Sequence, residues 1–390
     1  MGGLAAVAGA GTAGASGGST GGTGGAPTGG AAGTGGSSGS SAGAGGAAPT
    51  SAPLVYVGSN NGQISYYKLD AAQGQLTLVK SVTAGSLPSF LTLDAVHNRL
   101  YAVDEQDAKV LAFSADPKTG DLTAINTVSS GGAGPAFVGL DHSLKFVLVA
   151  NYDGGTASVF PINANGGLGT PNTVTPGMET HMILTDPANK FAFVMNLQSN
   201  TVAQYVFDAT AGTLKPNAVP SVKTPAKSGP RHMAFHPNGK FAYLIHETDY
   251  TLSAYSYDAT LGQLSAQPLQ TLSTLAPGAN GTGNSTAEVV VAPSGNFVYG
   301  SNRGNDSIAT FSVDSTTGMM KFIGTTPSGG TVPRSFTISA DGKLMLVANE
   351  SGNVTSFAVD VTTGALTKGK SATAPKAPQF VGIVNWAAAP

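Results

Sequence analysis

The stretch Gly229 to Asp249, GPRHMAFHPNGKFAYLIHETD, has the pattern of a β-hairpin. Two short apolar segments, Ala234-Phe235 and Phe241 to Ile245, flank the turn His236-Pro237-Asn238-Gly239. Pro-Asn-Gly supplies the backbone angles that a tight reversal needs. The hairpin also carries ionisable groups at both ends, because an Arg-His pair precedes its first strand and Glu247 follows its second strand.

The same unit recurs along the chain in one shared register. The other copies are SLPSFLTLDAVHNRLYAVDE, GPAFVGLDHSLKFVLVANY, ETHMILTDPANKFAFVMNL, STAEVVVAPSGNFVYGSNR and VPRSFTISADGKLMLVANE. The residue that opens the first strand is in turn Ser89, Ala136, His181, Arg231, Ala287 and Arg334. The residue just past the second strand is Glu105, Tyr152, Leu197, Glu247, Arg303 and Glu350. Such a spacing indicates a repeat architecture.

A second motif, Asp-x3-Gly-x-Leu, lies between the hairpin units. Its copies are Asp70/Gly74/Leu76, Asp116/Gly120/Leu122, Asp208/Gly212/Leu214, Asp258/Gly262/Leu264, Asp314/Gly318/Met320 and Asp360/Gly364/Leu366, with a degenerate copy at Asn163 to Leu168. These segments lack the alternating oxygen ligands and closing Glu of an EF-hand calcium loop. We therefore expect turns in which Asp caps the backbone, Gly takes a positive φ and Leu starts the next strand.

Each repeat predicts four antiparallel strands, for example Phe90 to Leu93, Leu100 to Val103, Val110 to Phe113 and Leu122 to Thr127. Four strands repeated every 45 to 50 residues or so, at about seven positions, are typical of a β-propeller. The chain starts at Leu54 to Val57 with a second strand, whereas Pro378 to Val384 has the register of an innermost strand. The sequence therefore predicts an all-β, seven-bladed propeller over residues 53–390, closed when the last strand completes the first blade and hides two sheet edges.

Residues 1–52 are almost wholly Gly, Ala, Ser, Thr and Pro, with no charged residue before Lys68. Such a segment has no side chains with which to bury a core, so we expect a disordered leader or linker. It lacks the basic start and apolar run of a secretory signal. It could be a surface tether or a low-complexity leader without a specific role. The linker-like composition favours the cell envelope or secretion, and the cytoplasm is the alternative.

Composition narrows the classes of partner. Only 10% of the residues are charged and the net charge is -2, which argues against binding nucleic acid. No apolar run approaches the length of about 18 residues that a membrane span needs. The absence of Cys excludes disulfides and thiolate chemistry. A propeller of this size is expected to be a self-sufficient monomer.

In a propeller, the innermost strand of each blade lines the central channel. The predicted fold therefore places the two register positions next to this channel. Residues at these positions should gather at one mouth of the channel. The ionisable or amide-bearing ones are His181, Arg231, Arg334, Gln379, Glu105, Glu247, Arg303 and Glu350. They are either a functional site or ion pairs that tie neighbouring blades together. His232 and His236, within or beside the turn, are expected to make structural hydrogen bonds.

Four segments together resemble a known family: GPRHMAFHPNGKFAYLIHETD, STAEVVVAPSGNFVYGSNRGNDSIATF, VPRSFTISADGKLMLVANE and ANYDGGTASVF. It is the seven-bladed propeller lactonase family, which includes cycloisomerase-type 6-phosphogluconolactonases and carboxymuconate-lactonizing enzymes. The resemblance covers residues 54–384 and implies that His181, Arg231, Glu247 and Arg303 are catalytic. The sequence departs from the family pattern at His246, where Asn is usual, at Glu179-Thr180-His181, and at Pro135-Ala136-Phe137, where a His is lost. These departures bear on substrate choice.

The chemistry of these residue types fits the opening of a lactone. A lactone is a strained ester, so its hydrolysis needs a base to activate water and cations to hold the oxyanion. Glu247 or His181 could be the base. Arginines beside Glu247 would lower its pKa, so His181 is the preferred base. Arg231 and Arg303 could hold the oxyanion, or a carboxylate or phosphate of the substrate. Further candidate substrate-binding residues are Arg334, Glu350, Glu105 and Glu288.

The sequence thus predicts a lactone hydrolase for a sugar-acid lactone, with a small-molecule partner and neither metal nor organic cofactor. His181, His246 and Glu247 have the right types for metal ligands but no closed-site spacing. Two alternatives stay open: a non-catalytic extracellular binding or scaffold propeller, and a muconate-type lactonizing cycloisomerase. Whether the lactone is phosphorylated also stays open.

Overall fold

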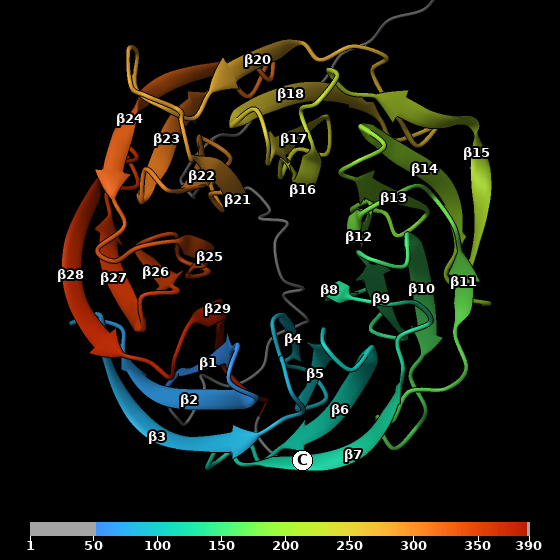
Figure 1. The fold of residues 1–390 in the computed structure, drawn as a ribbon, viewed down its shortest axis with the longest axis vertical. Coiled ribbons are helices and arrows are strands. Elements are labelled where there is room, and N and C mark those ends of the chain that lie inside the picture. Colours follow the sequence, from blue (N-terminus) through green and yellow to red (C-terminus); the bar gives the residue numbers. More distant parts are fainter. Residues whose placement is uncertain (1–51, 388–390) are drawn as a thin grey trace, which may run out of the picture. The chain divides into compact units, whose positions relative to one another are not determined.

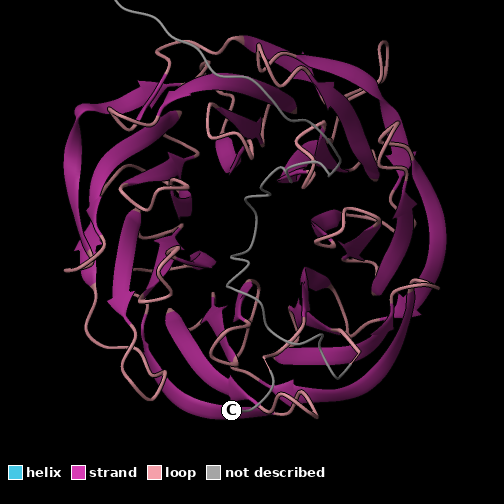
Figure 2. Ribbon diagram, turned by 180° about the vertical axis from the view of Figure 1, so that it is seen from behind, coloured by secondary structure: helices cyan, strands magenta, loops and turns pink. Residues whose placement is uncertain are grey.

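The computed structural model describes residues 52–387, in which every regular element is a β-strand. Seven antiparallel sheets are arranged radially around a central axis, with the innermost strands nearest to it (Figure 1). Seen from behind, the same ring contains strands and loops, and residues 52–387 include no helix (Figure 2). The predicted all-β, seven-bladed propeller is confirmed. The predicted leader, residues 1–52, lies almost entirely outside the described residues.

Each blade orders its strands from the channel outward, beginning with the innermost one. Blade 1 has β29 (Pro378–Val384), β1 (Leu54–Ser59), β2 (Gln63–Asp70) and β3 (Gln75–Thr83). Blade 2 has β4 (Leu91–Asp94), β5 (Arg99–Asp104), β6 (Lys109–Ala115) and β7 (Leu122–Ser129). Blade 3 has β8 (Pro135–Leu140), β9 (Phe146–Asn151), β10 (Thr156–Pro161) and β11 (Asn172–Val174). Blade 4 has β12 (Thr180–Thr185), β13 (Phe191–Asn196), β14 (Thr201–Asp208) and β15 (Thr213–Lys223).

Blades 5 to 7 follow the same plan, except that the outermost strand of blade 5 is split. Blade 5 has β16 (Pro230–Phe235), β17 (Phe241–His246), β18 (Thr251–Asp258) and the short β19 (Gln263–Leu264) and β20 (Gln270–Ser273). Blade 6 has β21 (Ser285–Val291), β22 (Phe297–Arg303), β23 (Ser307–Val313) and β24 (Met320–Pro327). Blade 7 has β25 (Pro333–Ile338), β26 (Leu344–Asn349), β27 (Asn353–Val359) and β28 (Leu366–Thr373).

The hydrophobic core lies between neighbouring blades, because the second strand of each blade is covered on both faces. Every residue of β26 is buried. Successive side chains of a strand point to opposite faces. Leu346 and Ala348 therefore join the cluster shared with blade 1, whereas Met345 and Val347 join the cluster shared with blade 6. Outer strands such as β28 are largely exposed, so each blade is stabilised mainly by its inner three strands.

The Asp-x3-Gly motif forms capped turns as predicted, and it also joins neighbouring blades. Asp116 Oδ1 accepts hydrogen bonds from the backbone N–H groups of Lys118 at 2.7 Å and Thr119 at 2.9 Å, and Gly120 has a φ of 82°. The Gly120 carbonyl oxygen accepts a hydrogen bond from the Tyr56 hydroxyl at 2.6 Å, across the boundary between blades 1 and 2. Blades 5 and 6 and blades 6 and 7 are joined in the same way, from Tyr243 to Gly318 and from Tyr299 to Gly364.

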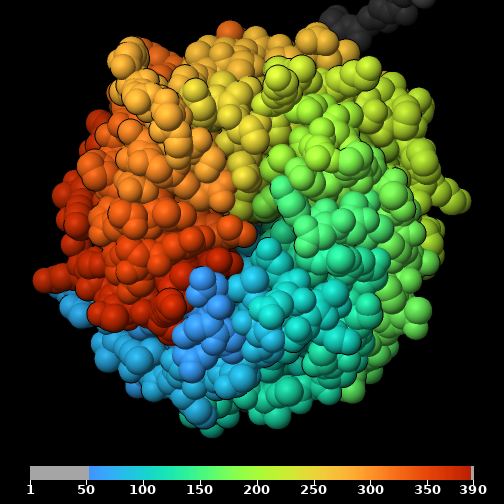
Figure 3. Space-filling view, viewed as in Figure 1, coloured from blue at the N-terminus to red at the C-terminus, as the bar shows by residue number. Residues whose placement is uncertain are grey.

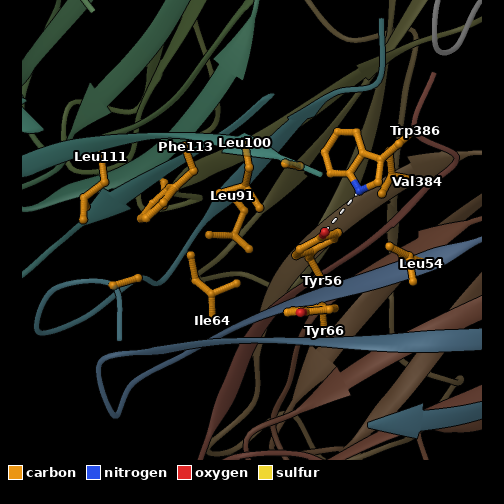
Figure 4. Close-up of a cluster of buried hydrophobic side chains, with 13 residues drawn as sticks. Leu54, Tyr56, Ile64, Tyr66, Leu91, Leu100, Leu111, Phe113, Val384 and Trp386 are labelled. Carbon is orange, nitrogen blue, oxygen red and sulfur yellow. Dashed lines mark hydrogen bonds between the residues drawn. The ribbon is translucent and has the colours of Figure 1, made fainter. Parts of the chain in front are cut away.

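The last strand closes the ring, as predicted. β29 pairs antiparallel with β1, with Leu54 opposite Val384. Just beyond β29, the Trp386 indole N–H donates to the Tyr56 hydroxyl oxygen at 3.1 Å within an apolar cluster that includes Leu91 of blade 2 (Figure 4). The closure therefore fixes blade 1 from both termini of the propeller and packs it against blade 2.

Candidate active site

The channel-facing register residues are placed by β-bulges in the innermost strands. In blade 5, Pro230 pairs with His246 and His232 pairs with Ile245, which leaves Arg231 as the extra, unpaired residue. Equivalent bulges in blades 3, 4, 7 and 1 each leave one extra residue, namely Ala136, His181, Arg334 and Gln379. In blade 6, two residues lie between the paired positions, Ala287 and Glu288. A bulge changes the direction in which a side chain points. The space-filling view shows the side chains of all blades closing in toward the centre (Figure 3).

The central feature of the site is one carboxylate held between two arginines. Glu247 Oε2 lies 2.9 Å from Arg231 Nε, and Glu247 Oε1 lies 3.0 Å from Arg303 Nη2. Arg231 Nη1 also donates to the Ala287 carbonyl oxygen at 2.6 Å, and Arg303 Nη2 donates to the Thr286 carbonyl oxygen at 2.7 Å. The group thus spans blades 5 and 6. Three of the four residues predicted to be catalytic are brought into direct contact.

The electrostatics of this group set the protonation states. Burial alone would raise the pKa of Glu247, but the charges of Arg231 and Arg303 act against it and hold the pKa below its ordinary value. Burial, together with the charge of Arg303, lowers the pKa of Arg231 to about 9, although Glu247 acts in the opposite direction. At neutral pH the carboxylate is therefore ionised and the guanidinium keeps its charge. Glu247 is a weak base in this setting.

His181, the fourth of these residues, lies beside the group as a neutral imidazole. It is buried, and burial followed by the charge of Arg231 places its pKa well below the ordinary value of 6.5. Its ring packs edge-on against Tyr152 and His232, at centroid distances of 5.6 and 5.1 Å. His181 Nδ1 is buried and has no hydrogen-bond partner among the described residues. A neutral imidazole nitrogen is therefore present next to two cations.

His232 makes a structural hydrogen bond, as expected from the sequence. It lies in β16, immediately after the bulge, and its ring packs against Phe90 and Phe137 as well as His181. Its Nδ1 lies 2.8 Å from Glu288 Oε1, so Glu288 pairs with this histidine, and its predicted role in binding substrate stays a prediction. His236 is in the turn, where its Nδ1 accepts from the Asn238 N–H at 3.1 Å, in agreement with the structural role expected for it.

The other predicted substrate-binding residues are distributed around the ring. Arg334 and Glu350 form a looser pair within blade 7, with 3.8 Å between Nη1 and Oε1, and the charge of Arg334 contributes to the lowered pKa of His181. Glu105 lies in blade 2 and forms no ion pair within residues 52–387. Its backbone N–H donates to Leu87 O, just as the Glu247 N–H donates to Gly229 O, so the two glutamates are structurally equivalent.

An aromatic cluster that the sequence patterns did not predict lies beside the charged group. Phe90 packs against Phe137 at 4.8 Å and against Phe380 at 4.9 Å between ring centroids. Like His232, each follows the channel-facing register residue of its blade. Because a bulge brings two consecutive side chains toward the same side, the position after each register residue is the signal that could have predicted this cluster.

No group of three or more His, Cys, Asp or Glu side chains within residues 52–387 could hold a metal ion. No helix in that range is long and apolar enough to cross a membrane.

The fold and the channel group define a seven-bladed propeller with an Arg-Glu-Arg centre. Residues 54–383 match the family model described as Lactonase, 7-bladed beta-propeller. The chain belongs to this family, as the motifs of the sequence indicated.

Relatives and solved structures are similar over most of the chain. It is 31% identical to a 6-phosphogluconolactonase of Formosa agariphila over 325 residues, covering 78% of this chain and 90% of that protein. It is 30% identical to a 6-phosphogluconolactonase of Bacillus subtilis, covering 80% and 91%. The structure of a periplasmic gluconolactonase of Pseudomonas aeruginosa matches with a TM-score of 0.79 and 26% identity, covering 85% of this chain and 99% of that chain.

Proposed function

We propose that this protein hydrolyses the ester bond of a sugar-acid lactone at the mouth of its central channel. The observation that carries the proposal is the Glu247 carboxylate fixed between Arg231 and Arg303, with the neutral His181 beside this group. Similar proteins named 6-phosphogluconolactonase and periplasmic gluconolactonase support the same reaction class.

In the proposed reaction, His181 is the general base. Its imidazole takes a proton from a water molecule as the water oxygen attacks the lactone carbonyl carbon. Negative charge then develops on the carbonyl oxygen and is stabilised by the guanidinium groups. Arg303 Nε is buried without a hydrogen-bond partner among residues 52–387, which leaves a donor for this oxyanion. The bond from the carbonyl carbon to the ring oxygen breaks, and the imidazolium returns its proton to the leaving alkoxide, giving the open-chain hydroxy acid.

Glu247 has a positioning role in this proposal. Its two oxygens contact one guanidinium each, so it fixes the separation of Arg231 and Arg303 before the substrate arrives. Preorganised donors stabilise the transition state without having to move during the reaction. The lowered pKa of Glu247 keeps it ionised for this task.

The hydrolase is favoured over both alternatives that the sequence left open. The names of the similar proteins describe lactone hydrolysis. None of these names describes a non-catalytic binding or scaffold module or a muconate cycloisomerase. No contact among the described residues specifically favours either alternative.

The proposal is tested by acid release in weakly buffered solution, corrected for spontaneous lactone opening. Glucono-1,5-lactone and its 6-phosphate are offered to the wild type and to Arg303→Ala. We expect turnover of at least one lactone by the wild type and a loss of about 100-fold or more in kcat for Arg303→Ala, the size seen when one oxyanion donor is removed.

The matched control is Arg99→Ala, because Arg99 also donates to one backbone carbonyl, that of Ala164, but begins β5 at the end of that strand opposite Glu105. Its kcat should stay near that of the wild type. Absence of turnover above background for both lactones, or equal losses in the two variants, would contradict the proposal.

A further inference from the structure

Three acceptor atoms on the other side of the channel are buried and unpaired. Ser89 Oγ, Glu105 Oε2 and Gln379 Oε1 have no hydrogen-bond partner within the described range. Ser89 and Gln379 are only 2% and 9% exposed. Buried polar atoms almost always find a partner, and leaving one unpaired costs free energy. A ligand that carries hydrogen-bond donors would supply the missing partners.

The three residues lie side by side at the boundary of blades 1 and 2. The backbone N–H groups of Ser89 and Glu105 both donate to the Leu87 carbonyl oxygen, at 2.8 and 3.0 Å. Gln379 comes from the neighbouring innermost strand, β29. The residues that follow Gln379 and Ser89, namely Phe380 and Phe90, are in ring contact at 4.9 Å. The three residues thus come from β29, from the segment just before β4 and from the end of β5, with aromatic rings next to them.

The chemistry of this group differs from that of the arginine side of the channel. The bulge residue beside Glu247 is Arg231, and the bulge residue beside Glu350 is Arg334. The residue in this register position beside Glu105 is Ser89, so no cation neutralises that carboxylate among the described residues. A carboxylate, an amide oxygen and a hydroxyl oxygen accept hydrogen bonds from hydroxyl groups. The carboxylate also repels an anion.

We propose that Ser89, Glu105 and Gln379 form a subsite that binds the hydroxyl groups of an unphosphorylated sugar lactone. This inference rests on the proposed function and specifies its substrate. The lactone carbonyl faces Arg231 and Arg303, and the hydroxyl-bearing end faces blades 1 and 2. Phe90 and Phe380 offer an apolar surface for the C–H groups of the sugar ring. A phosphate at the hydroxyl end would meet the unneutralised Glu105.

The first test measures binding without catalysis. The probe is 1,5-anhydroglucitol, which keeps the ring and hydroxyls of glucono-1,5-lactone but has no ester, and binding is followed by calorimetric titration. We expect the wild type to bind it and Ser89→Ala and Glu105→Gln each to bind it about tenfold more weakly, the scale of one unpaired buried acceptor. Ser114→Ala, which removes an exposed hydroxyl on β6, is the control and should bind as the wild type does.

The second test measures which lactone is preferred. The wild type should have a higher kcat/KM for glucono-1,5-lactone than for its 6-phosphate, and Glu105→Gln should narrow that ratio because it removes the repelling charge. A preference for the 6-phosphate would overturn the subsite, as would failure of the wild type to bind 1,5-anhydroglucitol or unchanged binding in both variants. If the probe binds as expected but neither lactone is turned over, the subsite stands and the hydrolase proposal fails.

Discussion

Blades 5 and 2 present the same backbone to the channel but very different chemistry. In each, a glutamate follows the second strand and its N–H donates to a carbonyl two residues before the channel-facing register residue. In blade 5 that register residue is Arg231, and Glu247 is shared between two guanidinium groups. In blade 2 it is Ser89, and Glu105 Oε2 is buried without a hydrogen-bond partner among the described residues.

If both proposals hold, the repeat architecture separates two tasks within one channel. Equivalent backbones deliver side chains to equivalent places, so a single substitution at the register position decides whether the glutamate is neutralised. A neutralised glutamate fixes cations that can stabilise an oxyanion. An unneutralised glutamate binds hydroxyl donors and disfavours anions. The comparison therefore predicts that blade 5 governs turnover and blade 2 governs substrate binding.

The largest effect is expected from removing the two equivalent glutamates. Glu247→Ala should lower kcat by about 100-fold or more, because the anion that holds Arg231 and Arg303 in place is lost and the two cations repel each other. It should also lower the melting temperature, since two buried cations are left unpaired. Glu105→Ala should mainly raise KM. Both variants are measured by steady-state kinetics on glucono-1,5-lactone and by thermal unfolding. An equal loss of kcat in the two would contradict the prediction that blade 5 governs turnover and blade 2 governs binding.

A smaller change is expected when blade 2 is given the charge pattern of blade 5. Ser89→Arg places a cation beside Glu105, so the acceptors of the subsite become occupied and KM for glucono-1,5-lactone should rise about tenfold. The preference should move toward the 6-phosphate. Ser89→Ala is the comparison variant, because it removes the hydroxyl without adding charge and should not shift the preference. If Ser89→Arg and Ser89→Ala have the same preference, charge at this position does not select the substrate.

The pH dependence of kcat/KM tests whether His181 is the base. The base must be unprotonated, and burial and the nearby arginines place the pKa of His181 well below 6.5. The acidic limb of the kcat/KM profile should therefore lie well below pH 6.5, so activity should not fall as the pH is lowered through the ordinary pKa of histidine. Rates are corrected for spontaneous hydrolysis at each pH. A fall of activity centred near the ordinary histidine pKa would argue against His181 as the base.

The smallest effect concerns stability and the end of β17. His246 is buried, its Nε2 lies 2.9 Å from Ser253 Oγ, and burial lowers its pKa to about 3. The unfolded chain therefore binds a proton more readily than the folded one between the ordinary pKa of 6.5 and about 3, and stability is lost as pH falls through that window. His246→Asn, which introduces the residue found at the equivalent Asn196 and Asn302, should lose less stability there. The difference in melting temperature between the two proteins should change by about 2–4 °C from neutral to acidic pH, in favour of His246→Asn. A difference that stays the same at both pH values would exclude this contribution.

Much of the fold could be predicted from the sequence, because each blade repeats the same local signals. The hairpin turn at Asn238-Gly239 and the Asp-x3-Gly turns are decided by short-range backbone chemistry. The closure by Pro378 to Val384 followed from its register alone. The sequence did not reveal that the Asp-x3-Gly turns also join neighbouring blades. Their glycine carbonyl oxygens accept hydrogen bonds from tyrosine hydroxyls of the adjacent blade. Such contacts join residues far apart in the chain and leave no local pattern.

The candidate site was predicted in part. The register placed Arg231, Glu247 and Arg303 together because equivalent positions in successive blades are neighbours at the channel. The position of His232 just after a bulge depends on strand pairing and has no local sequence pattern. Phe380 was missed for the same reason. The pairing of Glu288 with His232 depends on side-chain direction across two blades and could not be read from spacing.

The most direct test of the central claim is the kcat/KM of the wild type and of Arg231→Ala for glucono-1,5-lactone, measured by acid release with both proteins shown to be folded. Arg231 is the buried cation that contacts both Glu247 and the backbone of blade 6. The account predicts enzymatic turnover by the wild type and a loss of about 100-fold or more in the variant. Equal turnover by the two proteins, or none above spontaneous opening in the wild type, would contradict it.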